Sequence, residues 1–251
     1  MSSICFIAFQ KKMRSQLSLV IFSLTVLPML TAAVVIVFMT MGDQPLAAQY
    51  AVVLALSYLL GSVPWGYLAL RWRRGVDIRE YGSGRIGMSN VLRTGGGRIA
   101  AAVLTLDIAK GILAVVLGRT VIGSTEGEVT AGLFVLVGHN WPVFLQFRGG
   151  RGILTGLGGL SVMAPLVAAI AAVAFLFITV LSRYVSLGSV LGVIVACLAM
   201  LALTIIGMYS TPYVLYTFLG SAIIIWQHRD NIRRIREGNE HRLGHPASRL
   251  G

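Results

Sequence analysis

The chain has 251 residues, of which 56% are hydrophobic and only 12% are charged, and its mean hydropathy is +0.81. A soluble domain usually carries about twice that charged fraction, so the composition excludes an ordinary soluble protein. The net charge of +12 does not indicate nucleic-acid binding, because the basic residues flank apolar runs instead of sharing one polar face. Spanning segments in a bilayer must be helices or a closed barrel. Since the apolar runs lack strand-like alternation, we predict an all-α, polytopic membrane helical bundle.

A basic N-terminus precedes the first apolar run, which extends from about residue 17 to residue 41. This run is long enough to span a bilayer and longer than the apolar core of a signal peptide. We therefore expect a membrane anchor there, and cleavage stays an open alternative. The predicted division is an N-terminal basic segment with an extra membrane helix (1–46), a main membrane domain (47–244) and a C-terminal tail (245–251).

After a second predicted span over residues 47–70, a glycine-rich loop occupies residues 81–97. Glycines give backbone conformations that other residues rarely adopt and let backbone N–H groups approach a ligand. The loop also carries hydroxyl, amide and guanidinium groups, on Ser83, Arg85, Ser89, Asn90 and Arg93. Together these groups predict an anion site, and phosphate is the anion that suits them. A flexible turn whose arginines only follow the topology rule is the alternative that the loop alone leaves open.

The next two predicted spans contain ionisable groups. The first covers residues 99–117 and holds Asp107 and Lys110, which lie three residues apart and so share a helix face. Ionisable residues inside a membrane are functional candidates, but a mutual structural pair explains these two equally well. The second span, residues 129–147, contains His139, for which a packing role is the simpler explanation.

An apolar stretch at residues 153–181 is too long for one ordinary span and is interrupted by Pro165. Two short helices that turn near Pro165 would return Arg183 to the same membrane side as the glycine-rich loop. A single tilted helix would send Arg183 and everything after it to the opposite side. We therefore predict two helices here, followed by spans at residues 187–208 and 212–226.

The resulting topology has eight membrane helices with both termini inside. It places every lysine and arginine except Lys110 and Arg119 on the cytoplasmic side, as the positive-inside rule requires. Four polar clusters then meet on one face, which are the glycine-rich loop and residues 148–152, 183–186 and 228–231. Their convergence favours a site for phosphate-bearing substrates at the membrane–water boundary.

Other chemistries find little support in the sequence. Cys5 and Cys197 are far apart and form no disulfide or metal-ligand pattern. No histidine is followed five residues later by aspartate, so histidine-activated transfer from a thioester is not indicated. A transporter for phosphorylated metabolites is an alternative, although the segment pattern has no inverted repeat and its polar residues gather on one face instead of the midplane.

Several motifs, in this order along the chain, resemble those of the bacterial membrane acyl-phosphate:glycerol-3-phosphate acyltransferases. They are Gly61–Tyr67, Asp77–Arg93, Asp107–Gly111, Gly138–Gly152, Arg183–Leu187 and His228–Arg234. The resemblance covers about residues 47–244 and implies a core of seven membrane helices, to which this chain adds its N-terminal one. It implies a multi-pass protein of the bacterial inner (plasma) membrane whose active site faces the cytoplasm, with neither a metal nor a coenzyme.

The reaction implied by the resemblance is transfer of an acyl group from a fatty acyl phosphate to the 1-hydroxyl of glycerol 3-phosphate. The products are lysophosphatidate and inorganic phosphate, in a step of phospholipid biosynthesis. The expected partners are these two substrates and the lipid bilayer, with no nucleic acid and no required protein partner.

The resemblance also assigns roles to individual residues. It implies catalytic roles for Ser83, His228 and Asn231, and substrate-binding roles for Arg85, Ser89, Asn90, Arg93, Arg151 and Ser186. Three places depart from the family pattern: Arg85 replaces a common asparagine, Met88–Ser89 replaces Ala–Thr while keeping a hydroxyl, and Arg151 replaces a common lysine. A divergent paralogue with another acceptor therefore stays an alternative. For the proton acceptor, His228 and the phosphate of the substrate are both open.

Overall fold

The computed structural model describes Met29, Ile36, Thr40 and residues 44–244 and 247–249. The predicted N-terminal helix over residues 17–41 thus lies almost wholly outside the described residues. The described helices are α2 (Leu46–Ser62), α3 (Trp65–Arg74), η1 (Ile78–Glu80), α4 (Met88–Gly95), α5 (Gly97–Ile122), α6 (Thr125–Asn140), η2 (Val143–Leu145), α7 (Ile153–Met163), α8 (Pro165–Ser182), α9 (Val185–Ile205), α10 (Pro212–Gln227) and α11 (Arg229–Arg236).

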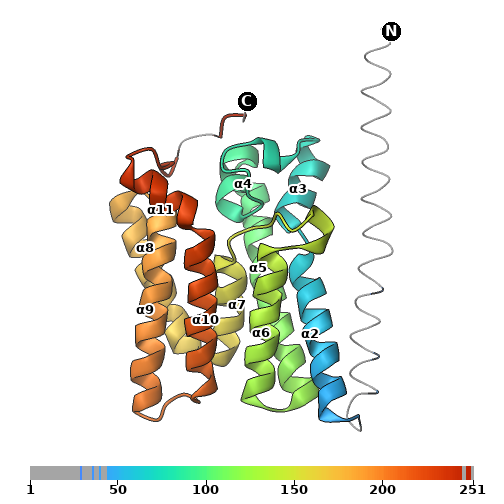
Figure 1. Cartoon of the computed structure of the whole chain (residues 1–251). Coiled ribbons are helices and arrows are strands. Elements are labelled where there is room, and N and C mark those ends of the chain that lie inside the picture. Colours follow the sequence, from blue (N-terminus) through green and yellow to red (C-terminus); the bar gives the residue numbers. More distant parts are fainter. Residues whose placement is uncertain (1–28, 30–35, 37–39, 41–43, 245–246, 250–251) are drawn as a thin grey trace.

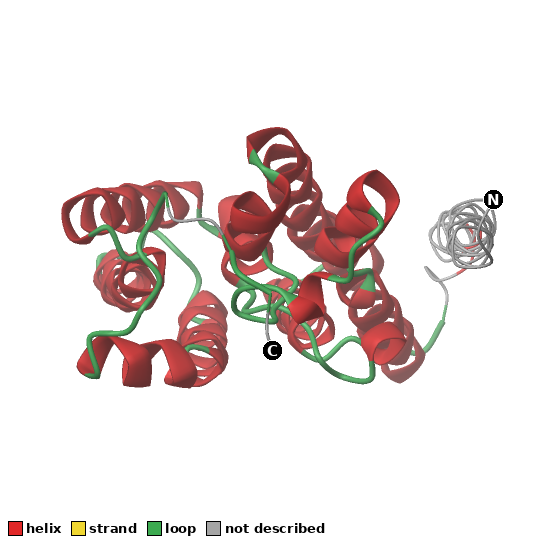
Figure 2. Ribbon diagram, turned by 90° about the horizontal axis from the view of Figure 1, so that it is seen from above, coloured by secondary structure: helices red, strands yellow, loops and turns green. Residues whose placement is uncertain are grey.

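The long helices stand side by side, with α3, α4 and α11 at one end (Figure 1). Viewed from above, the helices form two groups (Figure 2). Helices α2, α5 and α6 pack together in one group, and α9 packs between α8 and α10 in the other. Helix α7 lies between the groups and contacts α5, α6, α8 and α10. The all-α prediction is confirmed. If α2 and α3 are taken as one interrupted segment, the described bundle has seven long helical segments, α2–α3 and α5 to α10, which is consistent with the predicted core of seven helices.

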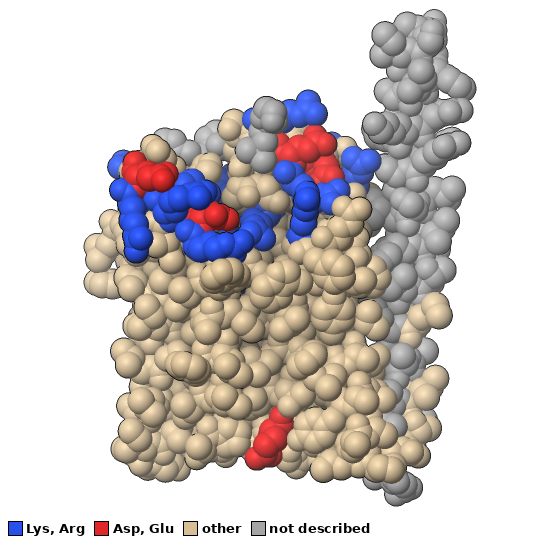
Figure 3. Space-filling view, viewed as in Figure 1, with Lys and Arg blue, Asp and Glu red and all other residues tan. Residues whose placement is uncertain are grey.

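Four helical stretches are long and apolar enough to cross a membrane, and two shorter apolar helices accompany them. The four are Leu46–Arg74, Gly97–Ile122, Pro165–Ser182 and Val185–Ile205, and the shorter two are Ile153–Met163 and Pro212–Gln227. On the face seen in Figure 3, the Lys, Arg, Asp and Glu side chains gather at the end with α3, α4 and α11, apart from one acidic patch at the opposite end. Between this charged end and the acidic patch the visible surface carries no charged side chain, which suits a bilayer, where charged groups are costly.

The predicted turn within residues 153–181 is confirmed. Helix α7 ends at Met163, and Ala164 takes an extended φ of −148° before Pro165 opens α8. A residue before proline avoids the helical region, whereas proline itself suits the first position of a helix because its missing N–H would have no partner there. Arg183 ends α8 with a left-handed φ of 61°, and the chain then reverses into α9.

Some details were not predicted. The span predicted over residues 47–70 is present within Leu46–Arg74, but its helix is interrupted, because α2 ends at Ser62 and α3 begins at Trp65. Pro64 cannot donate a backbone hydrogen bond and forces Val63 into an extended conformation with a ψ of 114°. The glycine-rich loop contains the helix α4, which we had not predicted, and the basic tail begins with the helix α11.

Close glycine contacts hold α7 against α5. A Cβ atom at Gly111 of α5 would collide with the backbone oxygen of Thr155, and one at Gly158 of α7 would collide with that of Ile108. Small residues that let two backbones approach in this way are a common basis for helix packing in membranes. These contacts fix α7 between the two helix groups, where its N-terminal end borders the candidate site.

Candidate active site

A cavity of about 210 Å³ lies at the charged end of the bundle, between the two helix groups. Its walls include every site residue predicted from the sequence, namely Ser83, Arg85, Ser89, Asn90, Arg93, Arg151, Ser186, His228 and Asn231. The structure thus brings together segments from four separate turns of the chain. Asp107, His139, Glu240 and His241 line the same cavity.

Asn90 shapes the glycine-rich loop from inside. Its side-chain amide is buried and donates hydrogen bonds to the carbonyl oxygens of Tyr81 and Arg85, each at 2.9 Å. Its Oδ1 accepts the backbone N–H of Ser83 at 3.2 Å. Gly82 lies in the same loop and has a φ of 56°, a conformation that residues other than glycine rarely adopt. The loop is therefore folded around Asn90, and the buried Oγ of Ser83 has no hydrogen-bond partner among the described residues.

The end of the chain returns to this loop. The backbone N–H of Gly82 donates to the carbonyl of Ser248 at 2.9 Å, and that of Ala247 donates to the carbonyl of Arg93 at 3.2 Å. Arg249 reaches Glu80 with a 3.1 Å ion pair. The tail predicted as a separate segment thus contributes residues 247–249 to the packing of the loop.

Two partly buried arginines, Arg93 and Arg151, line the cavity with unused hydrogen-bonding capacity. The Nε atoms of Arg93 and Arg151 have no acceptor in the described part of the chain. Burial, followed by the positive charges of Arg85 and Arg234, lowers the pKa of Arg151 to about 9. Burial also lowers the pKa of Arg93 and of Arg85. Cationic groups that leave water without full hydrogen bonding are costly, so this site is arranged to receive an anion.

Glu240 is a central site residue that the sequence analysis missed. Its Oε1 accepts hydrogen bonds from Ser186 at 2.8 Å and from Asn231 at 2.6 Å, and its Oε2 accepts one from Arg234 at 2.8 Å. It thereby joins the start of α9 to α11. No motif surrounds it in the polar tail, and its partner Ser186 is 54 residues away, so no local signal marked it.

His228 follows α10 and has a defined tautomer. Its Nδ1 lies 2.8 Å from the backbone oxygen of Ile224. Because a carbonyl only accepts hydrogen bonds, Nδ1 must carry the hydrogen, and the neutral ring keeps a lone pair on Nε2. Burial, followed by the charge of Arg151, lowers the pKa of His228 to about 4. The ring is therefore neutral at physiological pH and can accept a proton at Nε2.

His139 has the opposite arrangement. The ammonium of Lys110 lies 2.9 Å from Asp107 and 2.7 Å from Nδ1 of His139. An ammonium group only donates, so Nδ1 accepts and Nε2 of the neutral ring carries the hydrogen. Asp107 and Lys110 thus form a buried ion pair with each other, as one of the two explanations from sequence supposed. His139 does not offer a free lone pair to the cavity.

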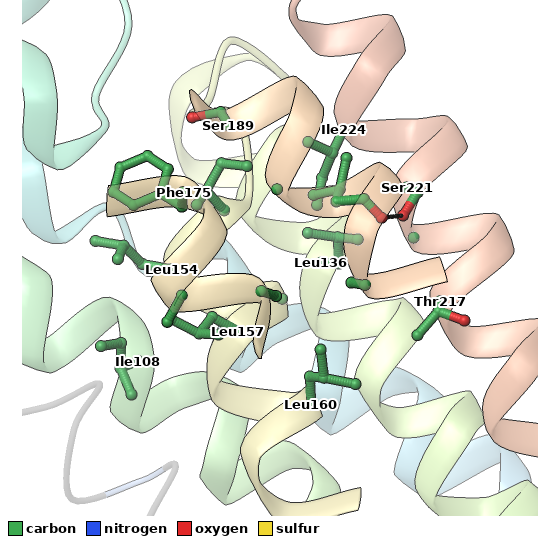
Figure 4. A pocket seen from close by; sticks show the side chains of 18 of the residues that line it. Ile108, Leu136, Leu154, Leu157, Leu160, Phe175, Ser189, Thr217, Ser221 and Ile224 are labelled. Atoms are coloured by element: carbon green, nitrogen blue, oxygen red, sulfur yellow. Dashed lines mark hydrogen bonds between the residues drawn. The ribbon is translucent and has the colours of Figure 1, made fainter. Parts of the chain in front are cut away.

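A second, apolar cavity of about 230 Å³ continues from the first. Both cavities are lined by Leu104, Ile153, Leu154, Phe175, Leu176 and Ser189. The apolar cavity extends from Ser189 and Phe175 at one end to Leu160 and Thr217 at the other (Figure 4). A polar compartment at the membrane surface thus opens directly into an apolar one between α7, α8, α9 and α10. Within the described ranges, no three His, Cys, Asp or Glu residues gather in a way that could hold a metal ion.

Comparison with known proteins identifies the family. Residues 51–238 match the glycerol-3-phosphate acyltransferase family. Glycerol-3-phosphate acyltransferase 3 of Dehalococcoides mccartyi is 43% identical over 210 residues, which are 79% of this chain and 97% of the relative. A glycerol-3-phosphate acyltransferase of Thermoanaerobacter sp. is 42% identical over 196 residues, or 78% of this chain and 96% of the relative.

Two solved structures have the same fold. One is the glycerol 3-phosphate form of PlsY (YgiH), an integral membrane glycerol 3-phosphate acyltransferase, with a TM-score of 0.72 and 35% identity. The match covers 78% of this chain and 96% of the PlsY chain. The other is the lysophosphatidic acid form of PlsY, with a TM-score of 0.69 and 32% identity. That match covers 78% of this chain and 95% of the PlsY chain. The chain therefore belongs to the glycerol-3-phosphate acyltransferase family of integral membrane proteins.

Proposed function

We propose that this protein transfers a fatty acyl group from an acyl phosphate to the 1-hydroxyl of glycerol 3-phosphate, giving lysophosphatidate and inorganic phosphate. The observation that carries the proposal is the junction of the two cavities. The unpartnered Nε atoms of Arg93 and Arg151 border the polar one, and the apolar one opens from it. This arrangement suits a reaction that joins a small phosphorylated acceptor to a fatty chain.

The polar cavity has the donors that phosphate requires. Arg93 and Arg151 supply fixed charge and directional N–H groups, which are the strong partners for phosphate oxygens. Arg85 and Ser89 line the same cavity, and Arg85 adds a positive charge that the common asparagine would lack. The reaction brings two phosphate groups together, on the acceptor and on the donor, and the surplus of guanidinium groups matches that need.

The apolar cavity supports a fatty donor. Its walls come mainly from Leu, Ile, Val, Ala and Gly residues of the membrane helices, together with Phe175 and Tyr216, and expose few polar atoms. Each methylene group that leaves water stabilises binding by about 0.8 kcal/mol, so a long acyl chain would fix the reactive carbonyl at the junction with the polar cavity.

An acyl phosphate is a mixed anhydride with a good leaving group, so direct attack by the acceptor hydroxyl is chemically sufficient. The hydroxyl oxygen forms a bond to the acyl carbon, the bond from that carbon to the phosphate oxygen breaks, and phosphate departs with the bonding pair. Holding both reactants in place lowers such a barrier by about 7–11 kcal/mol in favourable cases.

The hydroxyl proton needs an acceptor. His228 lines the cavity, and its Nε2 has no hydrogen-bond partner among the described residues, which supports a role as general base. The phosphate of the substrate is the alternative acceptor, and His228→Gln distinguishes the two. Ser83 and Asn231 remain candidates for orienting the carbonyl and the hydroxyl.

We further propose that the charged end of the bundle faces the cytoplasm of a bacterial inner membrane. The support is the positive-inside rule, because the arginine-rich segments gather at that end (Figure 3). No additional protein partner is required by the proposed reaction. The transport alternative is less well supported, since the relatives named above are acyltransferases.

The test uses the purified full chain in lipid bicelles with palmitoyl phosphate and glycerol 3-phosphate, following release of phosphate and formation of lysophosphatidate. We expect both products in equal amounts, and none when acyl-CoA replaces the acyl phosphate. Phosphate release with glycerol as acceptor but not with glycerol 3-phosphate would indicate a paralogue with a different acceptor. Absence of product with every acceptor would contradict acyl transfer.

A further inference from the structure

The buried cluster of Asp107, Lys110 and His139 lies beside the cavity but has no role in the proposed reaction. All three residues are nearly inaccessible to solvent, at 2%, 2% and 4% exposure. Buried charges are costly and persist where they hold partners in place. This cluster contacts two elements beside the cavity, which are the break between α2 and α3 and the turn at residues 148–152.

Lys110 supports the break between α2 and α3. Its Nζ lies 3.2 Å from the backbone oxygen of Gly61 and 3.4 Å from that of Val63. The last carbonyl groups of a helix have no partner within the helix, and Pro64 cannot supply an N–H. The ammonium group therefore satisfies the Gly61 carbonyl, and it adds a second hydrogen bond to the Val63 carbonyl, which also accepts the backbone N–H of Trp65 at 3.2 Å. These contacts fix α5 against the end of α2.

His139 supports the turn that carries Arg151. The backbone N–H of Gly150 donates to the carbonyl of His139 at 3.0 Å. A Cβ atom at Gly150 would collide with Nε2 of the His139 ring, and one at Gly149 would collide with the carbonyl of His139. The turn thus rests directly on the ring and backbone of His139, and Arg151 is the next residue.

Asp107 completes the cluster electrostatically. Its carboxylate borders a cavity that must receive anions, and the ammonium of Lys110 at 2.9 Å neutralises it. Without Lys110, the carboxylate would be uncompensated and would repel a phosphate across a poorly screened interior.

We propose that Asp107, Lys110 and His139 form a positioning cluster for Arg151. The cluster holds the turn at residues 148–152 so that the Arg151 guanidinium faces the cavity. This inference rests on the proposed function, in which Arg151 binds a phosphate group.

The test is a double-mutant cycle on the affinity for glycerol 3-phosphate, measured by calorimetry. Lys110→Met and His139→Asn are each made in the native chain and in an Arg151→Gln background. We expect each to weaken binding by about tenfold in the native chain, equivalent to about 1.4 kcal/mol. In the Arg151→Gln background we expect less than about twofold, because residues that act through one another are not additive.

Glu128→Gln provides the matched control. Glu128 lies on α6, is buried, and pairs with Arg119 of α5 at 2.7 Å, so it joins the same two helices that Asp107 and His139 join. It lines neither of the two cavities described. We expect Glu128→Gln to lower Tm and leave the affinity for glycerol 3-phosphate unchanged. If the Asp107, Lys110 and His139 cluster had only a structural role, its variants would likewise lower Tm and leave the affinity for glycerol 3-phosphate unchanged.

The proposal would be overturned if Lys110→Met and His139→Asn lost the same affinity in the native chain and in the Arg151→Gln background. It would also be overturned if both variants folded and kept the native affinity. If Lys110→Met does not fold, Asp107→Asn/Lys110→Met replaces it, because removing both charges leaves none uncompensated. Failure of the proposed reaction is a separate outcome, seen as no product from the native chain. The positioning role is then decided by the affinity of the same variants for inorganic phosphate.

Discussion

Asn231 donates a 2.6 Å hydrogen bond from Nδ2 to the buried Oε1 of Glu240. The same oxygen accepts the hydroxyl of Ser186, so one carboxylate orients two residues that the sequence placed in the site. Burial acts to raise the pKa of Glu240, but the hydrogen bonds from Asn231, Ser186 and Arg234 outweigh it and lower that pKa. The carboxylate is therefore ionised and offsets part of the surrounding arginine charge.

We expect Glu240→Gln to lower the free energy of unfolding by about 1–3 kcal/mol, because it removes a charged acceptor from buried donors. The measurement is Tm in detergent, with and without glycerol 3-phosphate. A ligand present at about 100 times its Kd raises the free energy of unfolding by about 2.7 kcal/mol. Glycerol 3-phosphate should therefore recover the stability of Glu240→Gln, because its phosphate replaces the lost negative charge. Glu237→Gln, an exposed position in the same tail, is the control. An unchanged Tm for Glu240→Gln would contradict the role of this carboxylate.

Arg93→Ala should raise KM for glycerol 3-phosphate by about 10- to 100-fold, because a hydrogen bond between charged groups contributes about 1.5–3 kcal/mol. Steady-state kinetics over a range of acceptor concentrations measures this effect. Arg98→Ala removes an exposed arginine five residues along the chain and should leave KM unchanged. Normal affinity for glycerol 3-phosphate in Arg93→Ala would rule out Arg93 as a phosphate ligand.

The membrane helices and the site segments could be predicted from sequence because their signals are local or simple. Hydropathy marks the spans, and the position of Arg183 requires the turn at Pro165. The site residues lie in short motifs, and the positive-inside rule places those motifs on one face. All nine of the predicted site residues consequently line one cavity.

The interactions that hold the site together could not be predicted, since they join distant parts of the chain. Lys110 contacts the carbonyl of Gly61 across 49 residues, and Ser186 contacts Glu240 across 54. Helix α4 was missed because glycines flank it, and its loop is ordered by the buried amide of Asn90. The break between α2 and α3 was not predicted either, because the apolar run continues through Pro64 without a change in hydropathy.

We expect the ring of His228 to stay neutral, with its hydrogen on Nδ1, as pH falls from 8 to about 5. Its pKa of about 4 lies below the ordinary 6.5, so the unfolded chain binds this proton first. The group thus contributes stability that is present above pH 6.5 and is lost as pH falls toward 4. The ¹⁵N chemical shifts of histidine-labelled protein report both properties, and His228→Gln assigns the resonance. Titration near pH 6.5 would contradict the buried, Arg151-facing environment.

Ala196→Phe should reduce turnover of palmitoyl phosphate more than turnover of octanoyl phosphate. Ala196 is buried on α9 and lines the apolar cavity, so a phenyl ring there would shorten the space for an acyl chain. The ratio of kcat/KM for the two donors is the measurement. Leu198→Phe, on the same helix but 62% exposed, should leave that ratio unchanged. Equal losses for both donors would place the acyl chain elsewhere.

Gly158→Ala should lower the free energy of unfolding by about 1–3 kcal/mol, because overpacking of a close helix contact forces the backbones apart. The added Cβ would collide with the backbone oxygen of Ile108 on α5. Gly156→Ala, on the same helix, is the matched control, since its Cβ would meet Ile224 at an ordinary 3.4 Å. Alanine also has a higher helix propensity than glycine, so Gly156→Ala should keep or raise Tm. Thermal unfolding of the two variants in one detergent decides the point, because equal Tm values would show that α5 and α7 are not held by this glycine contact.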